Sequence, residues 1–110
     1  MGYTAIIDYG VGNLASITHA LDYLGEKTLI TADRAEIERA DSIILPGVGA
    51  FPDAYAQLCA RGFPELLRAQ SAKKPMLGIC LGMQLLFDSS DEVRSCRGLG
   101  LIPGRVGLIR

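Results

Sequence analysis

A cysteine between two glycines carries the clearest chemical signal in this sequence. Gly78 and Gly82 stand two residues either side of Cys80, and a short apolar run, Met76–Ile79, leads into it. This is the cysteine counterpart of the G-x-S-x-G nucleophile elbow, where a strand turns sharply into a helix and presents the nucleophile at the corner. Glycines permit the tight turn and the close approach of other backbone. We therefore expect Cys80 to be a nucleophile; the alternative is a buried structural cysteine.

The elbow would also supply groups that assist the nucleophile. A helix beginning around Met83–Phe87 would direct free N–H groups and positive dipole toward Cys80, which favours the thiolate. The N–H of Leu81 would lie where an oxyanion forms. A cysteine nucleophile usually needs a histidine base. The one histidine, His19, falls inside an expected helix, so we interpret it as a helix-surface residue and expect no base within this chain.

A second glycine loop, Pro46–Gly49, follows a predicted buried strand, Ser42–Leu45. An oxyanion hole needs two donors: one from the residue after the nucleophile and one from another loop. The N–H of Val48 or of Gly49 could give the second. The alternative is a plain turn between the strand and the next helix.

A third glycine loop has a competing interpretation. Gly10, Gly12 and Ala15 fit the G-x-G-x-x-G/A fingerprint of dinucleotide-binding domains. Asp33 follows near the end of the next predicted strand, where that fingerprint places an acid for a ribose hydroxyl. The alternative is a tight turn, with Asp33 as the N-cap of the following helix.

Short β-branched runs alternate with helical patterns along the chain. The expected strands are Tyr3–Asp8, Lys27–Thr31, Ser42–Leu45 and Met76–Ile79. The expected helices run from an Asn13 N-cap to Leu24 with Gly25 as C′ residue, over Asp33–Arg39, over Asp53–Arg61 and over Pro64–Ala72. This alternation predicts an α/β fold with an open, mostly parallel sheet and helices on both faces. Ligands bind at the carboxyl ends of such strands, where all three glycine loops fall.

The last part of the chain is less regular. Ser89–Gly100 is expected to be polar and irregular, and Val106–Ile109 to be a further strand. A domain seldom stops on a strand. We therefore expect residues 1–110 to be the front part of a larger domain, truncated at its C-terminus.

Composition limits the class of protein. The 110 residues are 49% hydrophobic and 21% charged with a net charge of −1, which favours one globular domain and gives no reason to expect nucleic acid or an anionic membrane as partner. Three cysteines without a close-spaced pair argue against a disulfide framework and a C-x-x-C metal site, and a reducing cytoplasm is the simplest setting. We expect no signal peptide and no transmembrane helix.

Taken together, these motifs resemble the class I (triad) glutamine amidotransferases, whose fold is flavodoxin-like. Gly78–Gln84 is similar to that family's nucleophile motif, and Leu45–Ala50 is similar to its oxyanion loop. Ile7–Leu14 resembles, more narrowly, the opening of the glutaminase subunits of imidazole glycerol phosphate synthases, and Gly98–Gly104 is similar to the segment after their elbow helix. The resemblance implies that residues 1–110 are the N-terminal part of a single glutamine amidotransferase domain.

The resemblance implies a reaction and a set of roles. Cys80 would attack the side-chain amide of glutamine and form a glutamyl thioester. The N–H groups of Leu81 and of the Val48–Gly49 region would hold the oxyanion. Gln84 and the backbone of Gly47 would help to place the substrate. No cofactor or metal is implied. The family's catalytic histidine and glutamate lie in a later segment, so this stretch alone is expected to be inactive.

The resemblance also implies a partner. Ammonia would pass to a (β/α)₈ synthase subunit, in a heterodimer that makes imidazole glycerol phosphate in histidine biosynthesis. The residues expected to face that partner are Tyr9, Gly10, Gly12 and Asn13. The alternatives are another class I amidotransferase, a Rossmann-type dinucleotide-binding domain, or a cysteine-dependent stress protein or peptidase of flavodoxin-like fold.

Overall fold

Four parallel strands form the central sheet in the part of the chain that the structure describes. The structure is a computed structural model that describes residues 2–10, 14–91 and 95–107. The strands are β1 (Thr4–Ile7), β2 (Thr28–Thr31), β3 (Ser42–Leu45) and β4 (Met76–Gly78). They are ordered β2-β1-β3-β4 and every neighbouring pair is parallel. The four predicted strands are therefore confirmed, and their carboxyl ends share one edge of the sheet.

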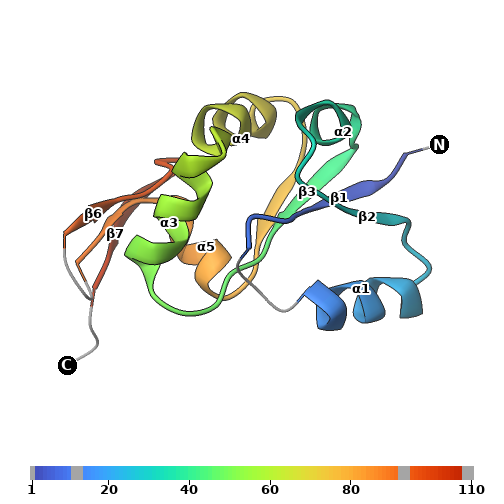
Figure 1. Cartoon of the computed structure of the whole chain (residues 1–110), viewed down its shortest axis with the longest axis horizontal. Coiled ribbons are helices and arrows are strands. Elements are labelled where there is room, and N and C mark those ends of the chain that lie inside the picture. Colours follow the sequence, from blue (N-terminus) through green and yellow to red (C-terminus); the bar gives the residue numbers. More distant parts are fainter. Residues whose placement is uncertain (1, 11–13, 92–94, 108–110) are drawn as a thin grey trace.

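Helices cover both faces of this sheet, as the alternation predicted. The helices are α1 (Leu14–Tyr23), α2 (Arg34–Arg39), α3 (Phe51–Ala60), α4 (Phe63–Ser71) and α5 (Leu81–Leu85). Figure 1 shows α1 on one face of the sheet and α2 and α4 on the other, with α3 and α5 toward the C-terminal strands. None of the helices in the described part of the chain is long and apolar enough to cross a membrane.

The two faces of the sheet differ in how well they are covered. Alternate residues of β1 and β3, such as Ile7 and Leu45, are buried in one core cluster with side chains of α2, α3, α4 and α5. The opposite face carries a row of apolar side chains, one from each strand, in register. The row is Ile30, Ile6, Ile44 and Leu77. Its inner members are buried, but Ile30 is 40% exposed and Leu77 is 57% exposed. Of the described helices, α1 lies on this face (Figure 1) and leaves these two outer side chains partly uncovered.

Two predicted helix caps, Gly25 and Asp33, are found. Gly25 adopts φ +79° after α1, as a C′ glycine should. Asp33 is the N-cap of α2, and its side chain accepts hydrogen bonds from the N–H groups of Ala35 and Glu36. The Glu36 carboxylate does not complete a capping box, because it accepts from the Thr31 hydroxyl at 2.5 Å.

The C-terminal prediction was wrong in its details. A second, three-stranded sheet contains β5 (Phe87–Ser90), β6 (Cys96–Arg97) and β7 (Ile102–Val106), in the order β6-β5-β7. β5 pairs antiparallel with β6 and parallel with β7. Ser89–Gly100 was expected to be irregular, yet it contributes residues to β5 and β6. The strand expected over Val106–Ile109 instead ends at Val106, and residues 108–110 lie outside the described residues.

The α2 cap gives a first prediction. Replacing Asp33 with alanine removes the acceptor for two helix N–H groups, so the free energy of unfolding should fall by about 1 kcal/mol. Asp33→Asn keeps an acceptor oxygen at the same position and should change stability by only a few tenths of a kcal/mol. Urea unfolding followed by circular dichroism measures both. Equal losses in the two variants would show that the cap does not stabilise α2.

Candidate active site

Cys80 stands at a sharp corner between β4 and α5. Its backbone has φ 55° and ψ −123°, and it is the one non-glycine residue with positive φ in the described part of the chain. A side chain in this conformation is strained, and such strain concentrates at functional sites. The cysteine is exposed to solvent, not buried in the core. The predicted sharp turn from strand to helix is thus present, and the alternative of a buried structural cysteine is wrong.

The glycines either side of Cys80 are required by close backbone packing. A Cβ atom on Gly82 would lie 1.8 Å from the carbonyl oxygen of Leu45, at the end of β3. A Cβ atom on Gly78 would lie 2.5 Å from the Cα of Met83 in α5. Neither position has room for a side chain. The expectation that these glycines permit a close approach of other backbone is confirmed. Because they have no side chains, the turn at Cys80 can pack against the end of β3.

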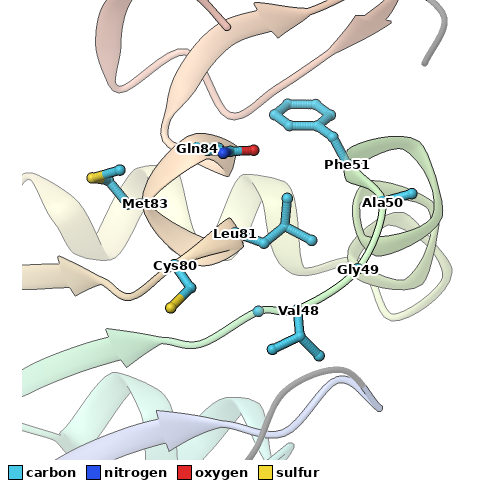
Figure 2. A pocket seen from close by; sticks show the side chains of 9 residues that line it. Val48, Gly49, Ala50, Phe51, Cys80, Leu81, Met83 and Gln84 are labelled. Carbon is cyan, nitrogen blue, oxygen red and sulfur yellow. The ribbon is translucent and has the colours of Figure 1, made fainter. Parts of the chain in front are cut away.

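A pocket lies between the elbow and the loop after β3. Its volume is about 430 Å³. Both segments line it, through Gly47, Val48, Gly49, Ala50, Phe51, Cys80, Leu81, Met83 and Gln84. Figure 2 shows Cys80 and Val48 on the two segments that line the pocket, and the Gln84 amide directed toward Phe51. All of the residues expected to act on glutamine therefore line one pocket. Of these lining residues, only Cys80 has a titratable side chain.

The predicted oxyanion donor is occupied in this conformation. The N–H of Leu81 donates to the carbonyl oxygen of Gly47 at 3.1 Å. It was expected to lie free for an oxyanion, so the hole is not formed here. Val48 and Gly49, the candidate second donors, are exposed beside it, and Gly49 has φ +95°. The loop and the turn at Cys80 line the same pocket, but the Gly47 carbonyl occupies the Leu81 N–H that an oxyanion would need.

The side chain of Tyr9 does not face a partner. It is fully buried, and its hydroxyl donates to the carbonyl oxygen of Pro46 at 2.5 Å. Burial raises the pKa of the Tyr9 phenol, so it stays protonated and able to donate. The expectation that Tyr9 contacts a partner is corrected for this reason. Gly10 is exposed, while Gly12 and Asn13 lie outside the described residues.

A signal for the burial of Tyr9 was present in the sequence. Ala5, Ile7 and Tyr9 alternate along and just beyond β1, and all three belong to the core cluster. Side chains two residues apart on a strand share one face. Extending this alternation one step beyond the strand predicts a buried Tyr9.

The remaining candidates from the sequence lie away from the pocket. His19 is an exposed residue of α1, as expected, and does not line it. The Asp33 carboxylate caps α2, which supports the N-cap interpretation over a ribose ligand. No base for Cys80 lines the pocket in the described part of the chain.

Fold and site together define an α/β protein in which a cysteine at a sharp strand–helix turn faces a glycine loop. A family model described as glutamine amidotransferase class-I matches residues 5–93. The match covers most of the chain, and the chain belongs to this family.

Similar proteins with curated names are more specific than the family model. The chain is 54% identical over 102 residues to the imidazole glycerol phosphate synthase subunit HisH of Exiguobacterium sibiricum, a match that covers 93% of this chain and 52% of that protein. It is 51% identical over 105 residues to the HisH subunit of Listeria monocytogenes serotype 4b, covering 94% of this chain and 50% of that protein. The chain therefore spans about half the length of these relatives.

A solved structure supports the fold. A chain described as glutamine amidotransferase superposes with a TM-score of 0.80 at 18% identity, over 96% of this chain and 56% of that chain. At this identity the likeness shows the fold alone.

The close packing of the elbow gives a second prediction. Gly82→Ala would drive a Cβ atom into the Leu45 carbonyl oxygen, so we expect a loss of about 3 kcal/mol in the free energy of unfolding. Gly25→Ala is the matched control, because Gly25 has positive φ but no atom within 4 Å of an added Cβ. It should cost about 1 kcal/mol through backbone strain alone. Similar losses in both variants, measured by chemical unfolding, would contradict the packing argument.

Proposed function

We propose that the protein containing this chain is the glutaminase subunit of an imidazole glycerol phosphate synthase. It hydrolyses glutamine to glutamate and supplies ammonia to a (β/α)₈ synthase partner in histidine biosynthesis. The observation that carries the proposal is Cys80, strained at the elbow and exposed in a pocket shared with the Pro46–Gly49 loop. The names of the relatives support the choice of this subunit over other class I amidotransferases.

The proposed chemistry begins at the sulfur of Cys80. The thiolate attacks the side-chain amide carbon of glutamine, and the carbonyl π electrons move onto the oxygen. Collapse of this tetrahedral intermediate breaks the carbon–nitrogen bond, and the nitrogen leaves as ammonia after accepting a proton. Water then attacks the glutamyl thioester, releasing glutamate and the free thiol. Gln84 and the backbone of Gly47 line the same pocket and are proposed to position the substrate.

One peptide rotation would complete the oxyanion hole. The peptide joining Gly47 to Val48 is planar, with the Gly47 carbonyl and the Val48 N–H pointing in opposite directions. The carbonyl now accepts from Leu81. Turning this peptide over would release the Leu81 N–H and bring the Val48 N–H toward the oxyanion. Both donors would then be supplied by a single movement, and we propose that this conformation is the catalytic one.

The base and the partner are proposed to come from outside these residues. His19, the one histidine, is exposed on α1 and absent from the pocket lining. A histidine and glutamate elsewhere in the protein would complete the triad, and this stretch alone would have no useful activity. The loop after β1, which includes the exposed Gly10 and extends through Gly12 and Asn13, is proposed to face the synthase subunit in a cytoplasmic heterodimer.

The nucleophile can be tested in the full-length protein with its synthase partner. Cys80→Ser should lower glutamine turnover by at least about 1,000-fold, because the serine hydroxyl is a poor substitute for the thiolate. Cys59→Ser is the matched control, since Cys59 is also exposed but does not line the pocket. An electrophilic glutamine analogue should label the wild type and Cys59→Ser but not Cys80→Ser. Saturable NAD binding without labelling would instead favour the dinucleotide-binding alternative.

The second oxyanion donor can be identified at Val48. Val48→Pro removes the N–H while leaving an apolar side chain, and should lower kcat by about 100-fold if that N–H holds the oxyanion. Val48→Ala keeps the N–H and should retain most of the activity. Steady-state glutamine hydrolysis by the full-length complex measures both. Equal activity in the two variants would assign the second donor to Gly49 instead.

A further inference from the structure

The loop that must rotate is attached to the core at one end. Tyr9 lies just beyond β1, is fully buried, and reaches the loop after β3 through its hydroxyl group. The contact joins the ends of two neighbouring parallel strands, because β1 and β3 are paired. A Cβ atom on Gly47 would lie 2.9 Å from the Tyr9 hydroxyl oxygen and 2.8 Å from the Gly82 nitrogen. Gly47 is therefore enclosed between Tyr9 and the elbow.

Two successive peptide groups of this loop are held by different partners. The Pro46 carbonyl, in the first peptide, accepts from the Tyr9 hydroxyl at 2.5 Å. The Gly47 carbonyl, in the second peptide, accepts from the Leu81 N–H at 3.1 Å. Only the second peptide has to turn to expose the oxyanion donors. Gly47 therefore joins the Pro46–Gly47 peptide, which would keep its orientation, to the Gly47–Val48 peptide, which would rotate.

We propose that Tyr9 is a positioning residue whose hydroxyl fixes the Pro46–Gly47 peptide, so that rotation at Gly47 brings the Val48 N–H to a defined place in the oxyanion hole. This inference rests on the proposed glutaminase function. Tyr9 does not line the pocket and touches no substrate, so its effect acts through the loop. Without the hydroxyl, the Pro46 carbonyl loses its partner and the first peptide is free to turn as well.

The expected effect falls on the chemical step. An oxyanion hole binds charge that develops in the transition state, whereas the ground-state amide does not depend on it. Tyr9→Phe removes one hydroxyl and keeps the ring that fills the core. In the full-length protein with its synthase partner, kcat for glutamine hydrolysis should fall about five- to tenfold, the scale of one lost hydrogen bond, with KM unchanged.

A second tyrosine provides the matched control. The hydroxyl of Tyr3 donates to the backbone carbonyl of Glu36, which is the same kind of hydrogen bond in a place remote from the pocket. Tyr3→Phe should lower thermal stability to a similar extent but leave kcat within twofold of the wild type. Loss of kcat in both variants would overturn the proposal, because it would then reflect general loosening of the fold.

The rate of alkylation by iodoacetamide distinguishes a defect in the loop from a defect at Cys80. This reagent reacts with Cys80 without an oxyanion hole, and the exposed Cys59 is an internal standard in the same digest. The alkylation rate of Cys80 in Tyr9→Phe should equal that of the wild type, although turnover falls. A parallel fall in alkylation would show damage to the elbow itself and overturn the proposal.

The remaining outcomes are also decisive. An unchanged or higher kcat in Tyr9→Phe would overturn the role of Tyr9 alone. Absence of glutamine turnover in the wild-type complex would overturn both the proposed function and this inference. Should Tyr9→Phe fail to fold, Tyr9→Leu is a second hydroxyl-free variant of similar apolar character, judged by the same ratio of turnover to alkylation.

Discussion

The site depends on one backbone contact, the approach of Gly82 to the end of β3. The Leu45 carbonyl occupies the space where a side chain on Gly82 would stand. This contact brings the turn that carries Cys80 against the loop that follows Leu45, so the proposed nucleophile and the candidate oxyanion donors line one pocket. The parallel pairing of β3 with β4 also places the loop after Leu45 beside the turn at Cys80, because Leu45 is in register with Gly78. The geometry of the pocket therefore depends on the absence of side chains at Gly78 and Gly82.

Two hydrogen bonds hold successive peptides of the loop, one at a buried site and one at the pocket. A buried carbonyl without a donor is costly, so the Pro46 carbonyl keeps its tyrosine partner at a site closed to water. The Gly47 carbonyl lies at the pocket, where water or substrate could replace the Leu81 N–H as its environment. In the structure the Leu81 N–H is satisfied within the protein, by the Gly47 carbonyl.

Much of this could be predicted because the signals were local. The four central strands, the Asp33 cap and the glycines of the elbow each follow from a short pattern. The second sheet could not be predicted this way: β5 is polar, and β7 includes Pro103 and Gly104, which β7 tolerates as an edge strand. The engagement of the Leu81 N–H was also beyond sequence reasoning, because its acceptor lies on a distant loop.

The uneven cover of the central sheet has a consequence for how the polypeptide behaves in concentrated solution. The row from Ile30 to Leu77 leaves its two outer side chains in water, and in the described part of the chain β4 ends the sheet on the Leu77 side. An apolar face beside an unpaired strand edge is a surface on which chains associate. Sulfate and other excluded salts strengthen such contacts. We therefore expect aggregation of this stretch to begin at β4, on the opposite face of the sheet from the main core.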